Sequence, residues 1–196
     1  MIVYQTTKSE FLNTAFTRDI EAVILAAYRQ RVGYGVSRQE VRSWKESLLA
    51  MAKVLNHDSI PASCGVAVEY GIPQTSKRID LLLSGRDEAG RDNLLIVELK
   101  QWETARRMAL YAGVRTRFAQ GEADTNHPSY QSWSYAELLR NFNETVHGED
   151  VPLQPCAYLH NCRDGKDLLD TFYAHYIELA PVFLAGDEER EKLRRF

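Results

Sequence analysis

Two apolar segments joined by a short polar turn constrain the fold of this chain more than any other feature. Residues 77–84 read KRIDLLLS and residues 94–100 read LLIVELK. Their length and composition predict two neighbouring β-strands, and the nearly unbroken apolar run of the second is typical of a central strand covered on both faces. These strands nevertheless carry Asp80, Glu98 and Lys100. Because burying a charge is costly unless it is paired or bound to a metal, the three charges need an explanation.

The rest of the sequence predicts helices and further strands around this pair. Apolar residues at helical spacing predict the first two helical regions. Gly33 and Gly35 end the first region, and a capping box of Ser37 and Glu40 begins the second. We expect helices at 7–31 (as one or two pieces), 37–55, 130–146, 167–173 and 186–196, strands at 66–72, 114–119, 157–160 and 182–184, a short helical or irregular connection at 104–111 and a loop at 121–129. This order predicts an α/β fold with a mixed central sheet flanked by helices on both faces.

Composition restricts the function classes. The net charge of -3 excludes a strongly basic, self-sufficient nucleic-acid binder, although it allows a basic patch. No apolar run approaches the length of a membrane span, and the first residues show no secretion signal. We therefore expect no membrane partner. The three cysteines include no C-x-x-C pair and are interpreted as reduced thiols, which favours a cytoplasmic protein.

The charges in the two strands predict a metal site. If the strands pair directly, Asp80 and Glu98 lie close together, and two carboxylates at short range repel each other. A divalent cation removes this repulsion, and Mg²⁺ prefers oxygen ligands of this kind, with Mn²⁺ as an alternative. The backbone carbonyl of Leu99 can supply one more oxygen. Lys100, beside this site, can orient a water molecule or stabilise charge on a phosphate.

Asp80 followed, on the next strand, by Glu98-Leu99-Lys100 resembles the active-site motif of the PD-(D/E)XK nuclease superfamily. The chain departs from that motif in having Ile79 where proline is typical. The pattern Q-x-x-x-Y formed by Gln131 and Tyr135 resembles the additional motif of the RecB-like group, and the spacing of four places both side chains on one helical face. His127 lies just upstream and is expected to join them.

The resemblance extends over roughly residues 35–185, which look like the N-terminal domain of bacterial proteins that carry a superfamily 1 helicase or ATPase domain. It implies one domain over 1–196, with a helical N-terminal extension at 1–35 and a nuclease core at 36–185, as part of a longer chain. No Walker A pattern is found in the sequence. The resemblance also implies one more acidic residue on an early helix, for which Glu40 is the candidate.

The resemblance implies a Mg²⁺-dependent nuclease that acts on DNA with a helicase partner. Asp80, Glu98, the Leu99 carbonyl and Glu40 would hold the metal, and Lys100, Gln131 and Tyr135 would complete the catalytic site. Two alternatives stay open: a nuclease fold that binds nucleic acid or regulates a motor without cutting, and an unrelated α/β enzyme whose strand charges form an internal ion pair.

Several residues also have ordinary explanations. Glu40 fits a capping residue, Glu69 fits either an extra ligand or a solvated edge residue, and Tyr130 and Trp133 fit packing groups better than base-stacking platforms. Four arginines after the two strands could contact phosphates or form a solvated face: Arg106, Arg107, Arg115 and Arg117.

Overall fold

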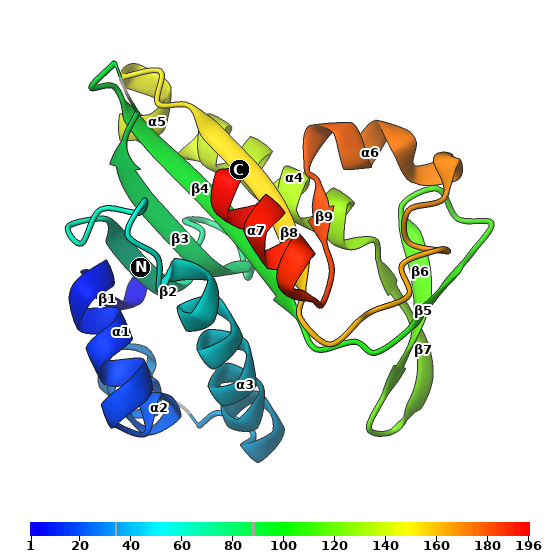
Figure 1. Cartoon of the computed structure of the whole chain (residues 1–196), viewed down its shortest axis with the longest axis horizontal. Coiled ribbons are helices and arrows are strands. Elements are labelled where there is room, and N and C mark those ends of the chain that lie inside the picture. Colours follow the sequence, from blue (N-terminus) through cyan, green and yellow to red (C-terminus); the bar gives the residue numbers. More distant parts are fainter. Residues whose placement is uncertain (34, 88) are drawn as a thin grey trace.

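The computed structural model describes residues 1–33, 35–87 and 89–196 of the chain, so that Glu88 in the predicted turn lies outside the described residues. Its centre is a six-stranded mixed sheet with strand order β1-β2-β3-β4-β8-β9 (Figure 1). β1 to β4 pair antiparallel, whereas β8 runs parallel to β4 and β9 parallel to β8. The strands are β1 Ile2–Thr7, β2 Gly65–Gly71, β3 Arg78–Arg86, β4 Asp92–Lys100, β8 Leu153–Leu159 and β9 Val182–Phe183.

Helices cover both faces of this sheet, which confirms the predicted α/β class. α1, α2, α3 and α7 share a buried core with one face, and α4 packs on the other (Figure 1). The helices are α1 Lys8–Thr17, α2 Ile20–Val32, α3 Arg38–Leu55, α4 Pro128–Phe142, α5 Glu144–Gly148, α6 Ala174–Leu179 and α7 Asp187–Arg195, with one 3-10 turn at Thr171–Tyr173. No helix in these described ranges is long and apolar enough to cross a bilayer.

Local signals explain where the helices beside the site begin and end. α2 ends at Gly33, whose left-handed backbone (φ 81°) suits glycine. Ser37 caps α3 by accepting the amide of Glu40, as predicted. α4 begins with Pro128 at its first position, and its N-cap is His127, whose ring nitrogen accepts the amide of Ser129.

A second, three-stranded sheet extends from the main body at the right of Figure 1. It consists of β5 Ala105–Arg107, β6 Gly113–Phe118 and β7 Gly121–Asn126. The predicted strand at 114–119 therefore exists but belongs to this sheet. A separate buried core that includes Trp102, Val114 and Tyr173 joins it to the β8–β9 edge of the main sheet.

Five expectations about elements were wrong. The segment 104–111 is not a helical or irregular connection throughout, because residues 105–107 pair with β6 as strand β5. Residues 2–7 form an edge strand, so the segment 1–35 is not entirely helical. Residues 121–126 form β7 instead of a loop, because cross-strand pairing with β6 stabilises a segment whose side chains are nearly all polar and exposed. The predicted helix at 130–146 is interrupted at Asn143, which caps α5. The predicted helix at 167–173 is mostly turn, and helical structure begins only at 171.

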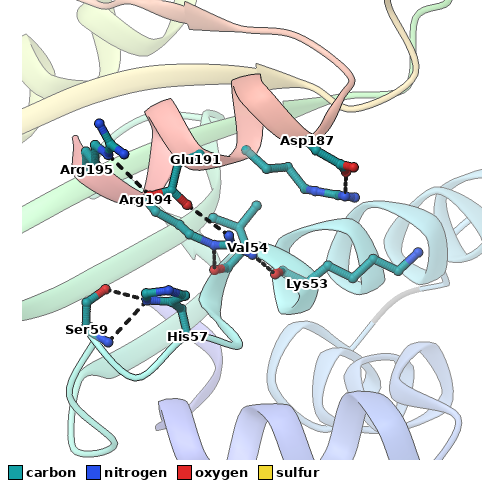
Figure 2. Close-up of polar contacts among 9 residues, drawn as sticks. Lys53, Val54, His57, Ser59, Asp187, Glu191, Arg194 and Arg195 are labelled. Carbon is teal, nitrogen blue, oxygen red and sulfur yellow. Dashed lines mark hydrogen bonds and ion pairs between the residues drawn. The ribbon is translucent and has the colours of Figure 1, made fainter.

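The C-terminal helix is fixed to the end of α3. Arg194 on α7 donates from Nε to the Val54 carbonyl and from Nη2 to the Lys53 carbonyl, each at 2.9 Å (Figure 2). Glu191 holds the same guanidinium group from one helical turn away. Arg194 thus satisfies carbonyls that the last turn of α3 cannot bond internally.

Candidate metal-dependent active site

Three neighbouring strands bring three carboxylates to one level of the sheet. Antiparallel pairing joins Val68 to Leu81 and Leu81 to Val97, so Glu69, Asp80 and Glu98 each lie one residue beyond these pairs. They line a pocket of about 340 Å³, whose other walls include side chains from α3 and α4. The regular pairing of β3 with β4 ends at Leu81 and Val97, and beyond it the Oδ2 atom of Asp80 accepts the amide of Leu99 at 2.8 Å.

The backbone is distorted where the carboxylates meet. Glu69 has a φ of 55°, a left-handed conformation that is uncommon for a residue with a side chain. The alternation of the strand changes there: Val68 packs with the α1–α3 core, whereas Tyr70 packs with the α4 core. Such strained positions are concentrated at functional sites, and here the distortion turns the Glu69 side chain into the pocket.

Glu98 is the centre of the contacts in the pocket. Its Oε1 atom accepts from Lys100 Nζ at 2.7 Å and from Gln131 Nε2 at 2.6 Å. Gln131 Nε2 also donates to the Tyr135 hydroxyl at 2.9 Å. The structure therefore brings together the five side chains that the sequence singled out for catalysis. The second oxygen of Glu98, Oε2, is buried and has no hydrogen-bond partner among the described residues.

Burial and mutual repulsion control ionisation in this pocket. Burial, followed by the charge of Asp80, raises the pKa of Glu98 well above its usual range. Burial likewise raises the pKa of Asp80. Burial would lower the pKa of Lys100, but the charges of Glu98 and Asp80 outweigh it and raise that pKa. One ammonium group therefore faces two carboxyl groups whose ionised forms are disfavoured, so both can be ionised together only where a further cation compensates them.

Arg78 organises the other side of the pocket. Its guanidinium donates to Glu40 Oε1 at 2.7 Å and lies 3.2 Å from Glu69 Oε2. Glu69 Oε1 accepts from the Trp44 indole at 2.7 Å. The Glu40 side chain is thus directed to Arg78 in the pocket, while its backbone amide completes the cap of α3. The local sequence gave no sign of the contacts that Arg78 and Trp44 make in this pocket.

The ionisation of Glu69 gives a testable pH dependence. Burial, followed by the charge of Asp80, raises the pKa of Glu69 to about 7 from its ordinary value of 4.5. The contribution of Glu69 to the free energy of unfolding is therefore fully present below about pH 4.5. It is lost as the pH rises through about 7, and the loss is up to about 3 kcal/mol. Urea unfolding at about pH 5 and about pH 8 should show a smaller loss of stability in Glu69→Gln than in the parent. The exposed Glu103→Gln variant is the control, and an unchanged pH dependence in Glu69→Gln would contradict the assignment.

One sequence expectation is not met at the site. His127 does not join Gln131 and Tyr135: it is fully buried, its Nε2 atom contacts the Leu168 carbonyl at 3.0 Å, and its ring stacks on Tyr173. The reason is its place as the N-cap of α4, which points the ring into the core. Of the four arginines, three have acidic neighbours within 4 Å, namely Arg106 with Glu122, Arg107 with Asp170 and Arg115 with Asp124.

No family model, curated protein or solved structure matches this chain. Its chemistry is therefore inferred from its own residues. In the ranges 1–33, 35–87 and 89–196, no three His, Cys, Asp or Glu side chains are arranged to hold a metal ion by themselves. Glu40 and Glu69 are engaged by Arg78, which leaves Asp80 and Glu98 as the two carboxylates nearest to forming an ion site.

Proposed function

We propose that this protein is a Mg²⁺-dependent nuclease that hydrolyses phosphodiester bonds in DNA, working with a helicase or ATPase. The observation that carries the proposal is the buried Oε2 atom of Glu98, which has no partner among the described residues and lies beside a second carboxylate on the neighbouring strand. A buried polar atom without a partner is rare in a native structure and indicates an ion or water. Carboxylate oxygens are the ligands that Mg²⁺ prefers, with Mn²⁺ as its usual substitute.

The donor set fits such an ion. Asp80, Glu98 and the Leu99 carbonyl would hold it, whereas Glu40, the further acidic candidate from α3, is engaged by Arg78. When bound, the metal lowers the pKa of a water molecule and neutralises charge on the scissile phosphate. Two carboxylates and a carbonyl leave room for water and substrate phosphate, as is common for Mg²⁺.

The protein's own residues have separate tasks in this proposal. Lys100 keeps its positive charge because Glu98 and Asp80 face it, so it can orient the attacking water and stabilise a phosphate oxygen. Gln131 fixes the carboxylate of Glu98 from α4, and Tyr135 fixes Gln131. Arg78 holds Glu40 and Glu69 in place and prevents them from adding more negative charge to the pocket.

A second candidate function is a nucleic-acid-binding or regulatory module that does not cut. The 2.7 Å contact of Lys100 with Glu98 and the engagement of Glu40 and Glu69 by Arg78 favour it, because they compensate part of the charge without a metal. A third possibility, an unrelated enzyme with an internal ion pair, rests on the same contact. The number of acidic groups argues against both, since Lys100 is one cation beside two carboxyl groups, Asp80 and Glu98, so that one of the two must be protonated or bound to a further cation.

The test combines cleavage with metal binding. The parent is incubated with single-stranded and double-stranded plasmid DNA, with Mg²⁺, Mn²⁺ or EDTA, beside Asp80→Asn. We expect cleavage by the parent only with a metal, and a rise in its unfolding temperature on adding Mn²⁺, because an ion that binds only the folded state stabilises it. Asp80→Asn should show neither effect, whereas Asp92→Asn, at the exposed far end of β4, should keep both. DNA binding without cleavage or metal stabilisation would favour the second candidate.

A further inference from the structure

Four side chains beside the candidate site form a closed ring of hydrogen bonds. Gln101 Nε2 lies 3.5 Å from Ser47 Oγ on α3, and it also donates to the Ser43 carbonyl at 2.8 Å. Ser47 Oγ lies 3.1 Å from His160 Nε2, and His160 Nδ1 lies 3.1 Å from Asn161 Oδ1. Asn161 Nδ2 donates to the backbone carbonyl of Gln101 at 3.3 Å and closes the ring.

The directions of these hydrogen bonds are determined by chemistry. The amide nitrogen of Asn161 donates to a carbonyl, so its Oδ1 atom faces His160 and can only accept. In a neutral imidazole, Nδ1 then carries the proton, and Nε2 accepts from the Ser47 hydroxyl. The Ser47 oxygen is in turn the acceptor for Gln101. Burial lowers the pKa of His160, which favours the neutral ring that this arrangement requires.

We propose that Ser47, His160 and Asn161 are positioning residues that hold the end of β4 for the chemistry at Lys100. Gln101 directly follows Lys100 and enters the ring twice, through its side chain and through its backbone carbonyl. The ring thereby ties the end of β4 to α3 on one side and to the segment after β8 on the other. This inference rests on the proposed function. A displacement of about 1 Å at a reacting group can cost about a hundredfold in rate, so the position of the end of β4 matters for catalysis.

Local hydrogen exchange tests the ring independently of activity. The Leu99 amide, which donates to Asp80, reports on the end of β4 inside the site, and the Leu94 amide, which donates to the Pro152 carbonyl, reports on the opposite end. In Ser47→Ala and Asn161→Ala we expect about tenfold faster exchange at Leu99 and no change at Leu94. Ser43→Ala is the matched control, because the ring uses only the backbone of Ser43.

Two further measurements complete the test. Nitrogen-15 NMR of the parent should show the Nδ1–H tautomer of His160. In the nuclease assay both variants should lose about tenfold or more in kcat with KM unchanged. The inference is overturned by unchanged exchange at Leu99, by equal acceleration at Leu94, by the Nε2–H tautomer, or by parent-like kcat in both variants of an active enzyme. If the parent does not cut DNA, the proposed function fails, and exchange and tautomer alone decide whether the ring fixes β4.

Discussion

Replacing Glu98 with glutamine is expected to abolish metal-dependent cleavage and to leave the protein at least as stable as the parent. Glutamine keeps an oxygen for Lys100 and Gln131 and places an amide where the partnerless Oε2 atom lies. Because burial and Asp80 disfavour the ionised form of Glu98, removing its charge relieves repulsion in the folded state. The cleavage rate should fall by about a thousandfold or more, since both a metal ligand and a fixed charge are lost.

The measurement pairs a plasmid cleavage time course with thermal unfolding in the presence and absence of Mn²⁺. Asp92→Asn, on the same strand but exposed and paired with Arg86, serves as the control for a lost carboxylate. The parent and the control should gain stability with Mn²⁺, and Glu98→Gln should not. Cleavage by Glu98→Gln at the rate of the parent would contradict the proposed metal site.

Replacing Lys100 with methionine should have the largest effect on stability of any single change in the site. Lys100 is the cation nearest to Glu98, at 2.7 Å, and its side chain is only 16% exposed. Breaking a buried pair by removing one partner leaves the other charge uncompensated, which typically costs about 3 kcal/mol or more. Cleavage should be lost as well, because no ammonium group then remains to orient the nucleophile.

A double variant separates the two effects of Lys100. Glu98→Gln combined with Lys100→Met removes both charges, so most of the lost unfolding free energy should return while cleavage stays absent. Urea unfolding measures the recovery, and the exposed Lys166→Met is the control. If Lys100→Met alone were as stable as the parent, Lys100 would not be the counter-ion of this pocket, and the internal ion-pair alternative would fail with it.

The pair of strands that carries the site could be predicted because the signal is local. The apolar runs of β3 and β4 and the polar turn between them lie within 24 residues, and antiparallel pairing of adjacent strands follows from them. The closeness of Asp80 and Glu98 then follows from strand register. The spacing of Gln131 and Tyr135 similarly determines that they share a helical face.

Other features had no local signal. β1 is a short edge strand whose pairing partner lies about 60 residues away, and β7 is polar on nearly all positions, so neither shows a clear apolar period. A histidine can cap a helix or contact a substrate, and the residue type at position 127 does not distinguish these two roles. The sequence left Glu69 equally open between ligand and edge residue, and only its left-handed backbone and its contacts with Trp44 and Arg78 give it a place in the pocket.

By itself the sequence determined the mixed α/β class, the two central strands and the presence of acidic and basic groups where burial makes them costly. The tertiary structure alone decided which charges compensate each other, that Arg78 engages Glu40 and Glu69, and that His160 and Asn161 tie β4 to α3. The physical reason is distance along the chain: periodicity reports on neighbours a few residues apart, whereas these contacts join residues from separate elements that only folding brings within hydrogen-bonding range.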